Sequence, residues 1–349
     1  MSEKENLQPE EIEIEPEKET AKPKKKFKIN IHMIMIACIL VILGISGYKL
    51  YSWNHGQTLE YDPNEDTSEF DVEKLDELMP IASGAGNGHE YDDETTVLLL
   101  GNGSLAFSRY ADFGLADRIA DAAGVTVYNG AFPYVTMATR NLAMIEQNYP
   151  DDIYSLTYLT DAFCTGDFKE IERVTNEYHS DGNYTQDAVA VLKGIDFEKI
   201  DVIVIMYDAM DYFEGRAIEN PGDDEERCTI VVSLNYSIRR IKEAYPYIRI
   251  IVSSPYYVEG FDQDGNIYDP DIVDAGNGTL SNYIFNELNA SVDLSVSFLD
   301  NFYGTINQNN YQSYVEYDKE MGYIHLNDNG EQALANRIAF AINSYPNDK

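Results

Sequence analysis

The sequence predicts a doubly wound α/β domain that follows one membrane-spanning helix. An apolar stretch lies near the N-terminus, and five short apolar runs are spread over residues 95–299 with amphipathic helical patterns between them. Such runs are typical of parallel strands buried on both faces, and strands that alternate with helices form a sheet with helices on its faces. Hydrophobic residues make up 44% of the 349 residues, which is enough for a large core.

The N-terminal part has the layout of a membrane anchor. Residues 1–28 are polar, rich in Glu and contain a lysine cluster just before residue 29, so we expect a disordered cytoplasmic tail. Residues 29–50 are mostly apolar and, at about 1.5 Å per residue, can cross a hydrocarbon core of about 30 Å. A cleaved signal peptide is the alternative, but no A-x-A-like site follows. We therefore expect a single-pass protein of the cell membrane with its main domain outside the cytoplasm.

Charge and cysteine usage exclude several classes of partner. The formal net charge of -36 repels phosphate backbones, so we do not expect nucleic acid to bind. The chain contains no C-x-x-C or H-E-x-x-H motif, and we expect neither a metal nor another cofactor. Cys164 and Cys228 either pair with each other or remain buried thiols, and the sequence leaves both alternatives open.

The elements can be assigned in order along the chain. Residues 51–94 form an acidic linker with one short helix near 71–79, and the folded domain covers 95–349. Short apolar runs predict strands at 95–100, 125–128, 202–206, 248–253 and 296–299. Apolar residues at helical spacing predict helices at 113–123, 154–163, 186–192, 230–244, 279–288 and 330–344. Gly124 and Pro246 end two of these helices, and Asp264-Gly265 predicts a hairpin turn within 260–268.

Parallel strands end at one edge of the sheet, and we expect the functional site there. The loops concerned are 101–110, 129–140, 207–216 and 318–328. They contain Ser104, a candidate nucleophile, and His325, a candidate general base. Serine is also common in plain turns, and a histidine beside a helix start needs no chemistry. Asp208 and Asp211 could bind a cation, although helix capping is the commoner use of such residues.

Four segments resemble the motif blocks of the SGNH, or GDSL, hydrolases. VLLLGNGS resembles the first block, G-D-S, and VYNGAF, which contains Gly130, resembles the second. VIVIMYDAMDYFEG resembles the third block, G-x-N-D, and YIHLNDNGEQALANRIA resembles the fifth, D-x-x-H. The resemblance covers about 95–345. It implies a flavodoxin-like, three-layer α/β/α sandwich with a five-stranded parallel sheet that acts on ester-linked substrates.

The chain departs from the family pattern at positions that carry the chemistry. The nucleophile position falls on Gly103, and Ser104 comes one residue late. The glycine and asparagine of the third block are Asp208 and Met210, and the aspartate of the fifth block is Gly322. Methionine has no donor, and loss of one oxyanion donor costs roughly 100–1000-fold in rate. The fold expectation survives these changes, whereas the activity stays open.

Two functions are therefore carried forward. In the first, the chain is an atypical esterase or acyltransferase acting on acylated cell-surface glycans. The roles would be Ser104 as nucleophile, His325 as base, Asp318 or Glu320 as its orienting acid, and backbone N–H groups at Gly103 and Gly130 as oxyanion donors, with Asp208 and Asp211 in the pocket.

In the second, the domain is catalytically inactive and binds a glycan or a partner protein at the cell surface. Tyr134, Phe132, Tyr256 and Tyr257 could then stack on sugar rings. Ordinary packing is the commoner use of aromatic side chains in a chain with 27 tyrosines.

Overall fold

The computed structural model describes residues 39–46, 74–86, 88–140, 148–179, 184–220, 227–262, 264–318 and 323–345. The chain divides into two units, Met1–Glu69 and Phe70–Lys349. In the first unit, residues 39–46 of the expected span are helical. Among the described residues, no helix has the length and apolar character needed to cross a bilayer. The cytoplasmic tail and the rest of the expected span lie outside the described residues, so the anchor stays a prediction.

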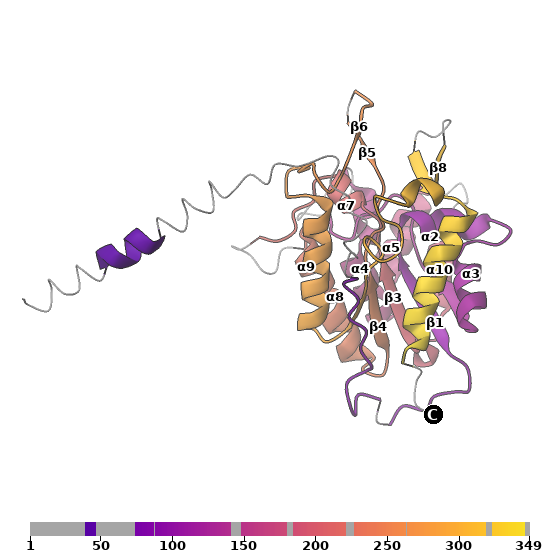
Figure 1. Ribbon diagram of the computed structural model, residues 1–349. Coiled ribbons are helices and arrows are strands. Elements are labelled where there is room, and N and C mark those ends of the chain that lie inside the picture. The colour runs from indigo at the N-terminus through magenta and orange to yellow at the C-terminus, as the bar shows by residue number, and fades with distance from the viewer. Residues whose placement is uncertain are drawn as a thin grey trace, which may run out of the picture. The chain divides into compact units, whose positions relative to one another are not determined.

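A five-stranded parallel sheet forms the centre of the second unit (Figure 1). Its strands are β1 (Thr96–Gly101), β2 (Thr126–Asn129), β3 (Val202–Met206), β4 (Arg249–Ser253) and β7 (Ser297–Leu299). Their spatial order is β2-β1-β3-β4-β7, and every neighbouring pair is parallel. Counted along the chain this is the order 2-1-3-4-5, which is the flavodoxin-like order.

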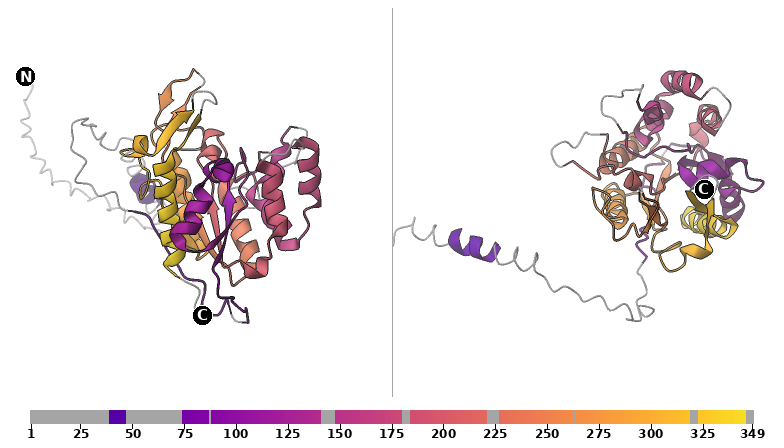
Figure 2. Two further views of the ribbon diagram at one scale, coloured as in Figure 1. Left: turned by 90° about the vertical axis from the view of Figure 1, so that its right-hand side faces the viewer. Right: turned by 90° about the horizontal axis from the view of Figure 1, so that it is seen from above.

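Helices cover both faces of this sheet and complete a three-layer sandwich (Figures 1 and 2). On one face α3 (Leu115–Ala123) packs against α10 (Asp328–Asn343). On the other face α8 (Ile230–Ala244) packs against both α4 (Leu156–Thr165) and α9 (Leu280–Asp293). The predicted α/β fold with five parallel strands is confirmed.

Burial on both faces explains why the central strands consist of continuous apolar runs in the sequence. Every residue of β1 and β3 is buried, because helices cover both faces, and the segments TVLLLG and VIVIM accordingly show no polar alternation. β2 lies at the edge of the sheet, and its side chains alternate between exposed and half-buried.

The expected linker is folded against the sheet from residue 74 onwards. Glu77 forms an antiparallel bridge with Phe298 of β7, with N···O distances of 3.0 and 2.7 Å. Arg337 of α10 donates from Nη2 to both carboxylate oxygens of Asp76, at 2.8 and 2.7 Å. The short helix expected near 71–79 is wrong for residues 74–79, because their backbone is paired with β7 instead.

Three further elements complete the second unit. β5 (Gly260–Phe261) and β6 (Ile267–Tyr268) form the predicted hairpin. β8 (Val315–Asp318) and β9 (Tyr323–Leu326) form a second hairpin where a loop was expected. α5 (Lys169–Tyr178) was also missed, because its buried face consists of only three residues in a charged segment. It packs against α6 (Tyr184–Gly194).

Cys164 and Cys228 do not form a disulfide with each other. The Sγ atom of Cys228 lies 3.2 Å from the hydroxyl of Thr139. Burial raises the pKa of Cys164 to about 12, which keeps that thiol protonated and unreactive at neutral pH.

A buried acid on α9 makes the stability of the core depend on pH. Glu287 is 4% exposed, and its Oε2 has no hydrogen-bond partner among the described residues. Burial raises the pKa of Glu287 well above its usual value, and the charge of Asp211 adds to the shift. The fold therefore favours the neutral form of this carboxyl group.

Replacement of Glu287 by Gln should remove part of the pH dependence of stability. An acid whose pKa is raised by folding stabilises the native state below its unfolded pKa of about 4.3, and this contribution is lost as pH rises towards the folded pKa. Gln has the shape of the protonated acid and no proton to lose. Between about pH 5 and pH 8, we expect the Tm of the wild type to fall more than that of Glu287→Gln.

The exposed Glu243 of α8 provides the control for thermal melts followed by circular dichroism. Glu243→Gln should keep the wild-type dependence of Tm on pH. An identical dependence in Glu287→Gln would contradict the assignment of a neutral buried acid.

Candidate functional site

The candidate site lies where β1 and β3 end, at the topological switch point of the sheet. In the five-stranded sheet, β2 lies on one side of β1, and the later strands β3, β4 and β7 lie on the other side. Doubly wound sheets bind ligands at this point, outside the carboxyl ends of the strands. Two short helices begin there, α2 (Gly103–Phe107) after β1 and α7 (Met210–Phe213) after β3.

The side chain of Asn102 joins three loops at this point. It is 1% exposed, its Nδ2 donates to Val135 O at 2.6 Å, and its Oδ1 accepts from the backbone N–H of Asp208 at 2.7 Å. Asn102 follows β1, Val135 lies in the loop after β2, and Asp208 lies two residues after the end of β3. The aspartate of the G-D-S block would offer Val135 no donor and would add a second carboxylate beside Asp208.

The carboxylate of Asp208 fills the space beside Gly103. A Cβ atom on Gly103 would lie 1.9 Å from Asp208 Oδ2 and 2.8 Å from its Cγ. Gly103 also has φ +39°, which disfavours any other residue. Gly103, at the nucleophile position of the first block, thus has no side chain. Asp208, at the glycine position of the third block, places its carboxylate in the space that a side chain at position 103 would occupy.

Burial raises the pKa of Asp208 to about 6, while hydrogen bonds from Met210 and Asn102 partly oppose this shift. The N–H of Met210 donates to Asp208 Oδ1 at 3.0 Å. The carboxylate is therefore mostly ionised at pH 7 and is held in one orientation.

Ser104 is paired with a tyrosine from the segment after β4. Its Oγ lies 2.8 Å from the hydroxyl of Tyr256, which is 7% exposed. Burial raises the pKa of Tyr256 well above its usual value, so the phenol stays neutral. A neutral phenol is a poor base and does not activate Ser104 for attack.

His325 lies on β9 and is oriented by a backbone carbonyl. Its Nδ1 lies 2.9 Å from Leu326 O, and because a carbonyl oxygen only accepts, Nδ1 carries the proton. Nε2 is then the basic nitrogen of the neutral ring. Asp318 ends β8, but its side chain and the whole of Glu320 lie outside the described residues, so the orienting acid stays a prediction.

An acid that the sequence analysis missed, Glu331, lies near His325 and Tyr256. Glu331, in the first turn of α10, contributes to the raised pKa of Tyr256, and His325 acts on the pKa of Glu331. Burial is the largest cause of the raised pKa of Glu331, against the opposing charge of Arg118. Arg118 of α3 donates from Nε to Glu331 Oε2 at 3.1 Å. The sequence could have indicated Glu331, because this acid lies in the first turn of the helix that follows His325.

Gly130 is needed for packing, and its N–H is engaged in the sheet. The N–H donates to Leu99 O at 2.9 Å and continues the β1–β2 ladder. A Cβ atom at this position would lie 2.8 Å from Leu192 Cδ2. An oxyanion could use this N–H only at the cost of a sheet hydrogen bond, so the predicted oxyanion role has no support in this geometry.

The carboxylate of Asp211 accepts hydrogen bonds from the backbone of the loop 129–140. It is buried, and its two oxygens accept the N–H groups of Met137 and Ala138 at 2.7 and 3.1 Å. Burial raises its pKa to about 7. Since backbone donors face both oxygens, the geometry does not favour a cation between Asp208 and Asp211. No group of three or more His, Cys, Asp or Glu able to hold a metal occurs within the described ranges.

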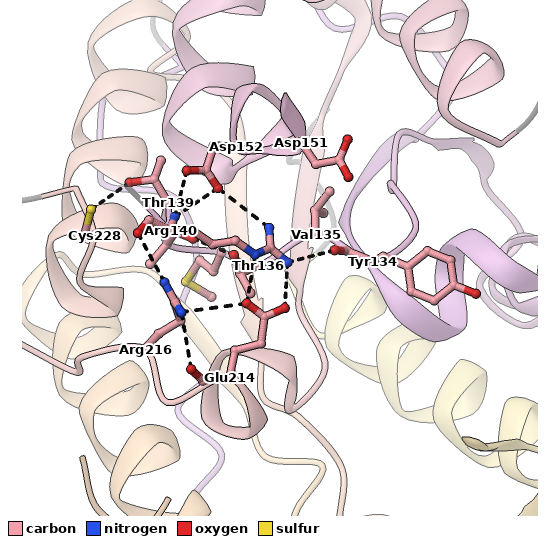
Figure 3. Close-up of polar contacts among 12 residues, drawn as sticks. Tyr134, Val135, Thr136, Thr139, Arg140, Asp151, Asp152, Glu214, Arg216 and Cys228 are labelled. Carbon is pink, nitrogen blue, oxygen red and sulfur yellow. Dashed lines mark hydrogen bonds and ion pairs between the residues drawn. The ribbon is translucent and has the colours of Figure 1, made fainter. Parts of the chain in front are cut away.

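A salt-bridge network holds the same loop from its outer end (Figure 3). Arg140 donates to Glu214 through Nε at 2.8 Å and Nη2 at 2.6 Å, and its backbone N–H bonds both oxygens of Asp152 at 2.9 Å. Nη2 of Arg140 also donates to Tyr134 O at 3.2 Å. Arg216 donates to the backbone carbonyls of Arg140 and Glu214. The loop is thus rigid although it contains no helix or strand.

Three of the four aromatic residues considered for sugar stacking are packed inside the domain. Phe132, Tyr256 and Tyr257 are buried, so ordinary packing is correct for them. Tyr134 is 55% exposed.

Solved structures with a related arrangement of strands and helices include several esterases. Est24, a carbohydrate acetylesterase from Sinorhizobium meliloti, is 13% identical over 71% of this chain and 98% of its own, with a TM-score of 0.41. The aryl esterase of M. smegmatis is 14% identical over 72% and 100%, with a TM-score of 0.41. A protein from Desulfitobacterium hafniense DCB-2, described as a candidate lipolytic protein of the G-D-S-L family, is 10% identical over 71% and 99%, with a TM-score of 0.38.

In its fold, the chain is similar to the SGNH, or GDSL, hydrolases. No protein-family model and no curated protein matches the sequence. At these identities and scores the chemistry of this SGNH-like domain has to come from its own contacts.

Replacement of Asn102 by Ala should destabilise the domain strongly. The change leaves a buried carbonyl at Val135 and a buried N–H at Asp208 without their partner, and each costs roughly 1–3 kcal/mol. We expect the free energy of unfolding in urea to fall by about 2–5 kcal/mol.

Asn343→Ala removes an exposed asparagine that makes one hydrogen bond, to Ala123 O at 3.3 Å, and should change the free energy of unfolding by less than about 0.5 kcal/mol. Equal changes in the free energy of unfolding for the two substitutions would show that the hydrogen bonds of Asn102 do not stabilise the contact between these loops.

Gly103 and Asp208 should be energetically coupled. Gly103→Ala places a methyl group against the carboxylate, whereas Asp208→Ala removes Oδ2 and Cγ and leaves Cβ at 3.4 Å. Gly103→Ala should therefore cost about 1–3 kcal/mol more in the wild type than in Asp208→Ala, measured by urea unfolding in a double-mutant cycle.

Gly124→Ala is the matched control, because Gly124 has φ +72° and no atom within 4 Å of its Cβ position. It carries the backbone strain without the clash and should be additive with Asp208→Ala. Additivity of Gly103→Ala would contradict the contact.

Proposed function

We propose that the second unit is an SGNH-like domain that binds its ligand and does not hydrolyse it through a serine nucleophile. The observation that carries the proposal is the carboxylate of Asp208 in the space beside Gly103. The proposed setting is the outer face of the cell membrane, with the N-terminal helix as anchor and a glycan or a partner protein as ligand.

The charge of Asp208 opposes ester hydrolysis directly. The transition state of acyl transfer places negative charge on the substrate oxygen beside the nucleophile. A carboxylate about 4 Å from that oxygen would cost roughly 4 kcal/mol at an effective dielectric constant of about 20. This corresponds to a loss of about 1000-fold in rate, in addition to the loss of the nucleophile itself.

The neighbouring groups do not restore the lost functions. Tyr256 is a neutral partner for Ser104, and the N–H of Gly130 is bonded to Leu99 O. The N–H of Met210 is bonded to Asp208, and its side chain has no donor. Each of these contacts occupies a group that an ester hydrolase would need for catalysis.

A fluorophosphonate probe tests the proposal on the full-length protein in detergent. We expect no covalent labelling, and no hydrolysis of p-nitrophenyl acetate or butyrate above the rate with heat-denatured protein. Labelling that disappears in Ser104→Ala would overturn the proposal.

A second candidate is an ester hydrolase with Ser104 as nucleophile and His325 as base. The hydrogen bond from His325 Nδ1 to Leu326 O favours it, because this bond leaves Nε2 as the basic nitrogen. In this case labelling should be lost in both Ser104→Ala and His325→Ala. Labelling that survives both changes would exclude this pair.

A further inference from the structure

Four aromatic residues form a cluster beside the candidate site. Phe107 belongs to α2, Tyr110 to the turn Ser108–Tyr110, Tyr134 to the loop after β2, and Tyr184 begins α6. The ring centroids of Phe107 and Tyr134 are 5.0 Å apart, and those of Tyr110 and Tyr184 are 4.6 Å apart. Phe107 links the two pairs through a contact of 6.2 Å with Tyr184. We call these four residues the aromatic rim.

Tyr134 is presented to solvent by a strained backbone. Its φ is +56°, in the left-handed region that a bulky residue rarely adopts. The nearby residues Phe132 and Val135 are buried, whereas Tyr134 is exposed. Strain of this kind persists only where surrounding contacts impose it, and it is concentrated at functional sites.

The contacts that impose this conformation are those that build the candidate site. Arg140 donates to Tyr134 O, and Asn102 donates to Val135 O. Phe107 lies three residues after Ser104 on the same short helix. The aromatic rim and the carboxylate of Asp208 are therefore parts of one rigid assembly.

The polar groups at the rim match the hydroxyl groups of a neutral ligand. The hydroxyl of Tyr110, which is 56% exposed, donates to the carboxylate of Asp187. Arg109 is turned inwards and donates to Asn129 O and Ala131 O. The carboxylate of Asp187 at the rim and the formal net charge of -36 of the chain repel anions.

We propose that the aromatic rim is a subsite for a neutral saccharide. The C–H face of one sugar ring would pack on the exposed ring of Tyr134, and hydroxyls of the same oligosaccharide would bond to the Tyr110–Asp187 pair. This assignment rests on the proposed binding function and names its ligand class.

Saturation-transfer NMR with the full-length protein tests the subsite, with cellotetraose, chitotetraose and maltotetraose as probes. At least one of them should bind at millimolar concentration. Tyr134→Gly should weaken that binding about tenfold or more. Its Tm should stay equal or rise, since glycine adopts the left-handed region freely.

The control is Tyr345→Ala, which removes another exposed tyrosine near the opposite edge of the sheet, where Tyr345 O accepts from Arg249 at the start of β4. It should leave saccharide binding unchanged. Wild-type affinity in Tyr134→Gly would overturn the subsite. So would a failure of all three saccharides to bind.

The two proposals fail separately. Fluorophosphonate labelling together with saccharide binding at Tyr134 would overturn the binding-only function and leave the subsite in place. Absence of both would overturn the subsite and leave the binding-only function.

Discussion

The buried amide of Asn102 is the interaction on which the arrangement of the site depends. Through its donor and its acceptor it sets the distances between the end of β1, the loop after β2 and the loop after β3. A side chain with only acceptors could not make both contacts. Because the amide is neutral, it adds no further charge beside the buried carboxyl groups of Asp208 and Asp211.

The loop 129–140 illustrates how polar contacts can replace regular secondary structure. Asn102 and Asp211 bond it from inside the domain, and Arg140 fixes its outer end to Glu214 and Asp152. Several of these partners are charged, so the bonds are stronger than those between neutral groups. The rigidity that they supply is what allows Tyr134 to remain in an unfavourable backbone conformation.

The sequence predicted most of the fold because apolar periodicity is a local property. All five sheet strands and the long helices followed from it, whereas α5 was missed because only three of its residues are buried. The site was less predictable, since its decisive contacts join distant residues. Ser104 and Tyr256 are 152 positions apart. The contact between Gly103 and Asp208 likewise cannot be predicted from the sequence around either residue. The segment around Glu77 was predicted to be a linker, because its pairing partner, Phe298, is distant in the sequence.

The departures from the family pattern are best understood as one coupled change. With a side chain at position 103, the carboxylate of Asp208 would collide with it, and without Asp208 the glycine would leave a void beside a buried amide. Ser104 does not compensate, because consecutive residues of a helix project about 100° apart. Its hydroxyl is therefore directed to Tyr256 and not into the space that Asp208 occupies. Gly103 and Asp208 together thus place a buried carboxylate where a side chain at position 103 would lie, beside the carboxyl ends of β1 and β3.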